Sequence, residues 1–323
     1  MNLNEFEIIK NYFGNTLKKN DKHIIQDIGD DCAIITIPKN NTLAISTDSL
    51  IEGTHFFKNT HPTDLGYKII AINLSDLAAM GSKPKWITLS LTIPKVDIYW
   101  IKHFSQSFFH TLNTYNMKLI GGNTTSGPLS ITASIYGIIP KKQALLRNGA
   151  KIGDLIYVTG TLGDSAAGLF LLKNKKYNIQ KDFDYLIKKH LHPIPRITHG
   201  QLLRNIANSA IDISDGLLTD VKKMLESSKH GANINLEKLP ISKTLKKHFT
   251  KKQWLTFATN SGEDYEICFT IPKKNISILN NKIHHLGIPY TCIGEIHHIK
   301  KGYNIFYNKK KINFSCKGYD HFC

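Results

Sequence analysis

Two patterns of hydrophobic and polar positions alternate along the chain. Short apolar runs bounded by turn-forming residues are typical of strands, and longer segments with apolar residues three or four positions apart are typical of helices. The first pattern predicts strands at residues 42–48, 87–94, 118–123, 129–139, 155–159 and 233–236. The second predicts helices at residues 5–13, 62–80, 96–115, 163–172, 181–191 and 197–207.

The order of these elements lacks the regular strand and helix alternation of a Rossmann fold. Residues 32–37 and 42–47 are neighbouring apolar runs, which we expect to pair as antiparallel strands in a mixed sheet. A chain of 323 residues also exceeds a single ordinary core. We therefore predict an α+β protein with two layered domains, residues 1–145 and 146–323, joined through the turn-rich segment 145–154.

We expect neither a membrane-spanning segment nor a signal peptide in this sequence. Its apolar runs stay well below the roughly 20 residues that cross a bilayer, and the N-terminus carries Glu5 and Glu7 where a signal peptide would be basic and then apolar. We expect a soluble, cytoplasmic protein without membrane contact. The number of cysteines is odd, and no two of them form a C-x-x-C pair, so the sequence indicates neither a disulfide framework nor a zinc site. We expect most of the cysteines to be buried in strands. They are Cys32, Cys268, Cys292, Cys316 and Cys323.

The formal net charge of +17, from 42 Lys and Arg against 25 acidic residues, is compatible with a nucleic-acid-binding protein. The lysines are scattered over predicted loops and helix faces, however, and no nucleic-acid-binding motif accompanies them. We expect a solvated basic surface and no nucleic-acid partner. A basic field also favours anionic, phosphorylated substrates.

The segment 210–220 predicts a buried strand that runs directly into a helix. Ile211 and Ile213 point into the core, so Asp212 and Ser214 share the opposite face, and Ser214 or Asp215 is expected to cap the helix. A similar glycine and acid pattern at residues 262–266 enters another strand. We expect the end of the 210–213 strand to be a binding edge.

Comparable oxygen-rich corners recur in the first half of the chain. Asp30 follows Gly29, Ser46, Thr47 and Asp48 end a strand, Asp76 lies in a helix, and Asn123 follows Gly121 and Gly122. Any one of these corners is explained by local capping. Together they predict several Mg²⁺ ions around a polyphosphate, because Mg²⁺ takes one or two carboxylates each alongside phosphate oxygens and water.

Phosphoryl transfer fits these corners, although the sequence has no P-loop, no Rossmann fingerprint and no protein-kinase motif. Such a reaction needs positioning and charge neutralisation more than a protein nucleophile. The helix start at Gly163 also resembles an anion-binding helix N-terminus.

Seven motifs then carry a family resemblance, in order and over about residues 6–322. They are IGDDCA (28–33), STD (46–48), NLSDLAAMG (73–81), GGNTT (121–125), VTGTLGDS (158–165), DISDGL (212–217) and SGEDYE (261–266). With them the chain resembles the bacterial thiamine-monophosphate kinases, which belong to the aminoimidazole-ribonucleotide synthetase-like superfamily. In position 123 the family has aspartate, and here an asparagine offers only a neutral carbonyl oxygen.

The resemblance implies ATP-dependent phosphorylation of thiamine monophosphate to thiamine diphosphate, the last step in making that cofactor. It implies an N-terminal domain that pairs with its twin in a homodimer, and a site in the cleft beside the C-terminal domain. The implied Mg²⁺ ligands are Asp30, Ser46, Thr47, Asp48, Asp76, Asn123, Asp212 and Asp215. The implied ATP contacts are Gly121, Gly122, Arg147 and Ser214, and the implied thiamine monophosphate contacts are His55, Glu263 and Tyr319.

This chemistry requires no catalytic protein residue, because the terminal phosphate of thiamine monophosphate is itself a nucleophile. We predict direct in-line transfer without a phosphoenzyme. Two alternatives stay open: another ATP-using enzyme of the same superfamily, and a basic nucleic-acid-binding protein. A selenophosphate-forming enzyme is disfavoured, since no reactive cysteine lies near the N-terminus.

Overall fold

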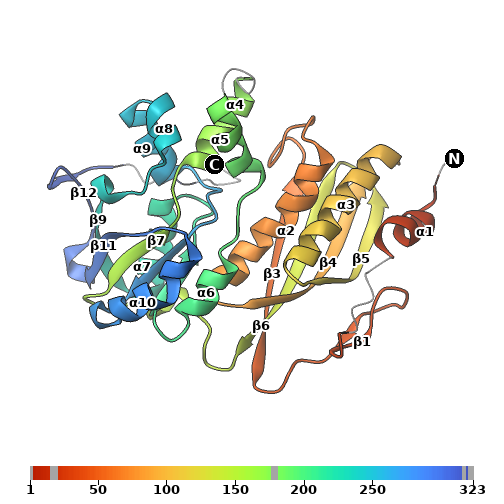
Figure 1. Ribbon diagram of the computed structural model, residues 1–323, viewed down its shortest axis with the longest axis horizontal. Coiled ribbons are helices and arrows are strands. Elements are labelled where there is room, and N and C mark those ends of the chain that lie inside the picture. The colour runs from red at the N-terminus through yellow and green to blue at the C-terminus, as the bar shows by residue number, and fades with distance from the viewer. Residues whose placement is uncertain (1–2, 15–20, 176–180, 315–317, 319–323) are drawn as a thin grey trace. The chain divides into compact units, whose positions relative to one another are not determined.

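The computed structural model describes residues 3–14, 21–175, 181–314 and 318. The chain divides into two compact units (Figure 1). Unit 1 comprises Met1–Leu77 and Ser82–Lys142, and unit 2 comprises Ala78–Gly81 and Gln143–Cys323. The predicted residues Tyr319, Cys316 and Cys323 lie outside the described residues.

A four-stranded mixed sheet forms the centre of unit 1, in the order β3–β6–β4–β5. Its pairs are antiparallel except for β4 with β5, which is parallel. Figure 1 shows helices α2 and α3 lying over one face of this sheet. The elements are β3 (Asn41–Ile51), α2 (Pro62–Ala79), β4 (Lys83–Ile93), α3 (Ile98–Thr114), β5 (Lys118–Ser126) and β6 (Ser130–Pro140).

Alternation along β6 shows why this sheet has one covered face. Ile131, Ala133 and Ile135 are fully buried, whereas the residues between them are partly exposed. On the opposite face, which we call the hydroxyl face, Thr132 bonds to Ser49 across the β3 pair at 2.7 Å. The alternation follows directly from the period of two in a strand. The strands predicted at residues 42–48, 87–94, 118–123 and 129–139 correspond to β3, β4, β5 and β6 and are confirmed.

The N-terminal segment of unit 1 forms a separate small sheet. The segment begins with α1 (Glu5–Ile8) and the π-helical turn η1 (Ile9–Phe13). The sheet itself consists of β1 (Ile24–Gln26) and β2 (Ile34–Ile35). The expected pairing of residues 32–37 with 42–47 is wrong, because β2 pairs with β1 and β3 pairs with β6. β3 gains eleven residue pairs with β6, whereas β2 spans only two residues. Gly29 has φ +121°, a backbone conformation that suits glycine in the turn between β1 and β2.

Unit 2 is built on a seven-stranded mixed sheet in the order β13–β12–β9–β11–β7–β10–β8. All of its pairs are antiparallel except β9 with β12. The strands are β7 (Leu155–Thr159), β8 (Ser209–Asp212), β9 (His230–Asn235), β10 (Ile267–Ile271), β11 (Tyr290–His298), β12 (Tyr303–Tyr307) and β13 (Lys310–Ile312). The two mixed sheets confirm the predicted α+β class.

The helices of unit 2 are α4 (Asp164–Lys173), α5 (Lys181–Leu191), α6 (Ile197–Leu203), α7 (Leu217–Ser228), α8 (Lys243–His248), α9 (Lys251–Asn260) and α10 (Ile276–Ile283). Short 3-10 turns are η2 (Arg147–Gly149), η3 (Leu236–Lys238), η4 (Lys273–Asn275), η5 (His284–Leu286) and η6 (Ile299–Lys301). Helix α6 ends four residues before the predicted end at 207. The other predicted helices lie within two residues of their expected ends, apart from 5–13, which is divided between α1 and η1.

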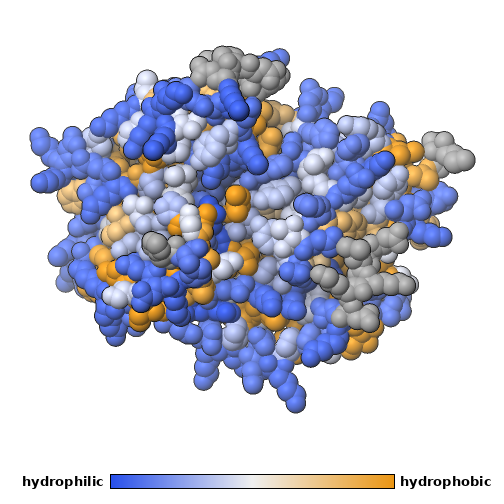
Figure 2. All heavy atoms as spheres, viewed as in Figure 1, coloured by the Kyte–Doolittle hydropathy of each residue, from blue (hydrophilic) through white to orange (hydrophobic). Residues whose placement is uncertain are grey.

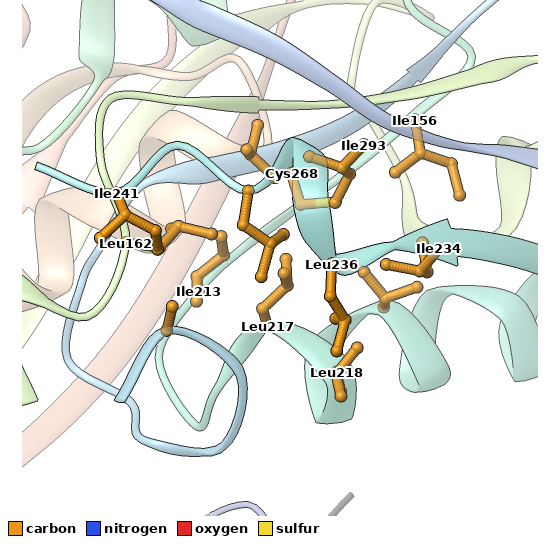
Figure 3. Close-up of a cluster of buried hydrophobic side chains, with 14 of the residues drawn as sticks. Ile156, Leu162, Ile213, Leu217, Leu218, Ile234, Leu236, Ile241, Cys268 and Ile293 are labelled. Carbon is orange, nitrogen blue, oxygen red and sulfur yellow. The ribbon is translucent and has the colours of Figure 1, made fainter. Parts of the chain in front are cut away.

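Apolar side chains from the sheet and from α7 meet in the core of unit 2 (Figure 3). Ile156, Cys268 and Ile293 come from three neighbouring strands, and Leu217 and Leu218 come from the first turn of α7. Burial of this first turn fixes where α7 starts relative to the sheet. The loop between β8 and α7 is positioned by that contact.

The visible surface is mostly hydrophilic, and the described cysteines differ in their burial. Figure 2 shows hydrophilic residues over most of the visible face, with apolar residues in small groups among them. Of the described cysteines, Cys268 is buried, Cys292 is half-buried and Cys32 is exposed, and all three are free thiols. The expectation of burial holds for Cys268 alone. Among the helices of the described residues, none has the length and apolar character needed to cross a membrane.

Candidate active site

In unit 1 the structure brings Ser46 and Asp76 together. The hydroxyl of Ser46 on β3 donates a hydrogen bond to Oδ2 of Asp76 on α2. Both side chains are partly buried on the helix-covered face of the sheet. Asp48 lies two residues after Ser46 and shares this face, because side chains alternate along a strand. Two carboxylates and one hydroxyl of the predicted set therefore lie on the same side of the sheet.

Thr47 and Asn123 lie on the other side. Oγ1 of Thr47 bonds to Oγ of Ser134 at 2.8 Å on the hydroxyl face. Asn123 on β5 stands opposite Ser90 in the register, and Ser90 stands opposite Thr132 on the same face. The side chains of Thr47 and Asn123 therefore lie on the opposite face of the sheet from those of Ser46 and Asp48.

Gly122 is needed for a structural reason. A Cβ atom at this position would clash with the carbonyl oxygen of Leu89 on the neighbouring strand β4. The sequence predicted that the glycine pair exposes backbone to a ligand, and Gly122 is exposed. The close approach of β4 is a second requirement that the sequence could not show.

Asp30 and His55 lie in turns of unit 1. The exposed carboxylate of Asp30 accepts the amide of Asp31 at 2.8 Å. Nδ1 of His55 accepts the amide of Ile51 at 3.1 Å, so Nδ1 carries no proton in this bond and Nε2 is the donor nitrogen of the neutral ring.

In unit 2 the loop after β8 is fixed against the segment that precedes β10. The amide of Ile213 donates to the carbonyl of Glu266 at 2.8 Å, and the amide of Glu263 donates to the carbonyl of Ser214 at 2.9 Å. A Cβ atom at Gly262 would clash with the carbonyl of Ser214, so only glycine fits this approach. The two motifs DISDGL and SGEDYE are thereby held side by side. Asp212 ends β8 opposite Ile267 and is buried.

Asp220 organises this loop. Its Oδ2 accepts the amides of Ser214, Asp215 and Gly216 at 3.1, 3.0 and 3.2 Å. The expected cap by Ser214 or Asp215 is wrong: the N-cap of α7 is Gly216, with φ +121° and no side-chain cap. The carboxylate comes instead from inside the helix, and it aligns three consecutive amides on one oxygen.

Lys223 lies one turn further along α7 and binds two carboxylates. Its ammonium donates to Oδ1 of Asp220 at 2.9 Å and to Oδ2 of Asp215. Burial disfavours the charged ammonium, but the hydrogen bonds to Asp215 and Asp220 outweigh it and raise the pKa of Lys223. Burial raises the pKa of Asp220, against the opposing effect of Lys223. Neither Asp220 nor Lys223 was predicted as a site residue, although their spacing of three along the predicted helix places the two side chains on one face.

Glu263 contacts a buried histidine. Nδ1 of His190 lies 3.2 Å from Oε2 of Glu263 and 3.2 Å from Oγ of Ser165. Both partners share one ring nitrogen, so this arrangement is not a serine–histidine–carboxylate triad, in which the histidine uses both nitrogens. The histidine, which also contacts the serine, instead restricts where the Glu263 carboxylate lies.

The predicted anion-binding start of α4 is filled by the protein. The amide of Gly163 donates to both carboxylate oxygens of Asp264, at 3.1 and 2.9 Å. Burial, with the nearby charges of Asp164 and Glu266, raises the pKa of Asp264 well above its ordinary value. This helix N-terminus therefore serves the packing of the SGEDYE segment.

A buried ion pair supports the same segment and was missed in the sequence. Glu266 accepts Nε of Arg196 at 2.6 Å and Oγ1 of Thr159 at 2.6 Å. His199, one turn after Arg196, is buried beside this pair. Burial, then the charge of Arg196, lowers the pKa of His199 to about 4. The predicted ATP contact Arg147 lies at the surface in η2.

The donors suit a hard cation that binds together with phosphate. Among the described residues, no three His, Cys, Asp or Glu side chains converge as a ready metal site. Acidic groups instead contact single hydroxyls or amides, such as Asp76 with the hydroxyl of Ser46 and Asp30 with the amide of Asp31. Mg²⁺ commonly binds through one or two carboxylates and completes its shell with substrate phosphates and water. The oxygen-only donors fit Mg²⁺.

Comparisons with known proteins agree with this chemistry. The model of the AIR synthase related protein N-terminal domain matches residues 29–139, and that of the C-terminal domain matches residues 151–297. The thiamine-monophosphate kinase of Buchnera aphidicola subsp. Schizaphis graminum is 60% identical over the whole of both chains. These matches confirm the family that the seven motifs predicted.

Solved structures extend the similarity to the fold. The thiamine-monophosphate kinase of Stenotrophomonas maltophilia K279a is 36% identical with a TM-score of 0.85, over 91% of this chain and 93% of its own. AaThiL, solved in complex with AMPPCP and TMP, is 32% identical with a TM-score of 0.78, over 89% of both chains. The chain thus belongs to the AIR synthase related family and, within it, to the thiamine-monophosphate kinases.

Proposed function

We propose that this chain transfers the γ-phosphate of ATP to thiamine monophosphate in a Mg²⁺-dependent reaction, giving thiamine diphosphate and ADP. The single observation that carries the proposal is the ordered loop after β8: the amides of residues 214–216 converge on Asp220, and the loop follows Asp212 and carries Asp215 beside the segment of Glu263. The full-length similarity to thiamine-monophosphate kinases supports the same activity.

The residues of the chain have three tasks in this proposal. Asp212 and Asp215 in unit 2, and Asp30, Ser46, Asp48 and Asp76 in unit 1, hold Mg²⁺ through oxygen, with Thr47 contributing its carbonyl and Asn123 its amide oxygen. Bound Mg²⁺ neutralises phosphate charge and offsets the repulsion between donor and acceptor phosphates. Gly121, Gly122, Arg147 and Ser214 bind ATP, and Arg147 adds charge-assisted hydrogen bonds to phosphate.

The acceptor side is proposed to use His55, Glu263 and Tyr319. A phosphate oxygen of thiamine monophosphate attacks the γ-phosphorus directly, so no protein nucleophile and no phosphoenzyme take part. His190 lies 3.2 Å from the Glu263 carboxylate and 3.2 Å from the Ser165 hydroxyl, so the histidine restricts the position of that carboxylate. A cytoplasmic location stays a prediction from the sequence.

We also propose that unit 1 pairs with a second copy through its hydroxyl face. Ile45 is 60% exposed on this face, and Ile51 on the same strand is also exposed. Exposed apolar residues beside paired hydroxyls suit a sheet-to-sheet contact. Ile45→Glu should shift the protein from dimer to monomer in light scattering; a wild-type that is already monomeric would contradict the proposal.

The activity is tested by incubating the purified protein with ATP, Mg²⁺ and thiamine monophosphate and separating the thiamine phosphates by chromatography. Thiamine diphosphate should form from the monophosphate and not from unphosphorylated thiamine. ATP hydrolysis without thiamine diphosphate would move the assignment to another enzyme of the superfamily. Salt-sensitive binding to duplex nucleic acid with neither activity would favour the basic binding protein instead.

A further inference from the structure

Two consecutive lysines on α7 have different surroundings. Lys223 donates to Asp220 at 2.9 Å and also to Asp215. Lys222 points to the helix surface, where it lies 3.8 Å from Glu226 and is 59% exposed. The two lysines carry the same charge on the same helix, and they differ in their contact with the loop 213–216.

The two carboxylates that Lys223 bridges also differ. The side chain of Asp220 is 1% exposed, and its second oxygen is occupied by three backbone amides. The side chain of Asp215 is 35% exposed, and its Oδ2 is the atom that Lys223 contacts. One end of the bridge is therefore a structural group, and the other is a proposed cation ligand.

We propose that Lys223 is a built-in counter-ion that competes with a divalent cation for Asp215. The inference rests on the proposed function, because it takes Asp215 as a ligand of Mg²⁺. In the cation-free protein the ammonium neutralises Asp215 and holds its carboxylate beside the loop. When a divalent cation binds, repulsion between two positive charges on one oxygen makes Lys223 release Asp215 and keep Asp220. Lys223 is a positioning residue, and it weakens cation binding in the absence of phosphate.

Competition of this kind has a useful consequence for a kinase site. An acidic loop without a counter-ion binds divalent cations whether or not a nucleotide is present. While Lys223 is bound to Asp215, this carboxylate attracts a divalent cation less strongly. The phosphates of the nucleotide must then supply the rest of the attraction for the cation. The cation therefore binds most strongly when it arrives together with phosphate, as expected for Mg²⁺ in phosphoryl transfer.

The test is a titration of the full-length protein with Mn²⁺, with free Mn²⁺ measured by electron paramagnetic resonance in the absence of nucleotide. Lys223→Met should bind Mn²⁺ about fivefold more tightly than the wild type, the effect of losing an exposed ion pair. Lys222→Met makes the same change in net charge and should bind like the wild type. Lys223→Arg keeps the positive charge and should also bind like the wild type.

Lys223→Gln protects the test against misfolding, because its amide can still donate to the buried Asp220; it should show the same gain as Lys223→Met. Equal or weaker binding by the Lys223→Gln variant, or no Mn²⁺ binding by any variant, would overturn the inference. Asp215→Asn separates this failure from failure of the proposed function. If Asp215→Asn loses Mn²⁺ while Lys223→Gln gains nothing, Asp215 remains a cation ligand and the competition is absent. If Asp215→Asn binds like the wild type, both the ligand assignment and the inference are wrong.

Discussion

The oxygen-rich corner of unit 1 and that of unit 2 fix their carboxylates by different means. In unit 1, Ser46 and Asp48 lie on β3, whose backbone pairs with β6 over eleven residue pairs. In unit 2, Asp215 lies on a loop whose backbone amides depend on the side chain of Asp220. The corner of unit 1 is therefore held by the sheet, whereas the corner of unit 2 is held by one carboxylate together with backbone bonds to the segment before β10.

The two corners also differ in charge compensation. Asp76 accepts a hydrogen bond from the neutral hydroxyl of Ser46, whereas Asp215 accepts one from the charged ammonium of Lys223. A hydroxyl can remain beside a carboxylate that binds a cation, because the hydroxyl oxygen is itself a ligand. An ammonium cannot. Under the proposed function, the corner of unit 1 can therefore take a cation with its hydroxyl in place, whereas the corner of unit 2 has to release Lys223 first.

The largest expected effect is the loss of Asp220. Asp220→Ala leaves three loop amides without their acceptor and should destabilise unit 2 by about 3 kcal/mol, since each lost bond at a buried group is costly. Chemical denaturation measures this loss, and thiamine diphosphate formation should fall with it. Asp220→Asn keeps an oxygen acceptor and should lie between Ala and the wild type. A fully stable Asp220→Ala protein would show that the loop is held by other contacts.

An intermediate effect is expected from pH, through His199 in unit 2. Burial and Arg196 lower its pKa to about 4 from an ordinary 6.5, so between these values the unfolded chain binds a proton that the folded chain refuses. Stability is therefore present above pH 6.5 and is lost as the pH falls toward 4, by at most about 3 kcal/mol. His199→Gln removes this component, so the difference in denaturation midpoint between pH 7 and pH 4.5 should shrink. An unchanged difference would place the acid sensitivity elsewhere.

The smallest effect on stability is expected at Ser46. Ser46→Ala removes one hydrogen bond from a strand that β6 already fixes, and the unfolding free energy should change by less than about 1.5 kcal/mol. The rate of thiamine diphosphate formation should fall clearly even though the unfolding free energy changes little, because Asp76 loses the hydroxyl that orients its carboxylate. Kinetics and denaturation on the same preparation check both. A stability loss as large as that of Asp220→Ala would remove the distinction between the two corners.

The sequence predicted the features that depend on local pattern. The alternation at Ile211 and Ile213 and the helical spacing after Leu217 were sufficient to place β8, the loop and α7. The partner of β3 was not predicted correctly, because strand pairing between residues 41–51 and 130–140 leaves no local signal. Proximity in sequence favoured residues 32–37 instead.

The candidate site residues were named from the sequence by their residue types, whereas the contacts that support them were not. The aspartates were singled out because local capping does not explain so many oxygen-rich corners, but Asp48 lies inside β3 and not at its predicted end. Asp220 looked like an ordinary acid in the first turn of a helix, and its role depends on a loop that folds back over it. Arg196 and Glu266 are distant in sequence, and only the fold of unit 2 makes them a buried pair.

The central claim is that these acidic corners bind the metal ions of phosphoryl transfer to thiamine monophosphate. Its most direct test is the rate of thiamine diphosphate formation by Asp212→Asn, measured beside its melting curve. Asn is close in size to Asp and lacks the charge, so the account predicts a loss of at least about 100-fold in turnover with the fold intact. Wild-type turnover by a folded Asp212→Asn protein would contradict the account.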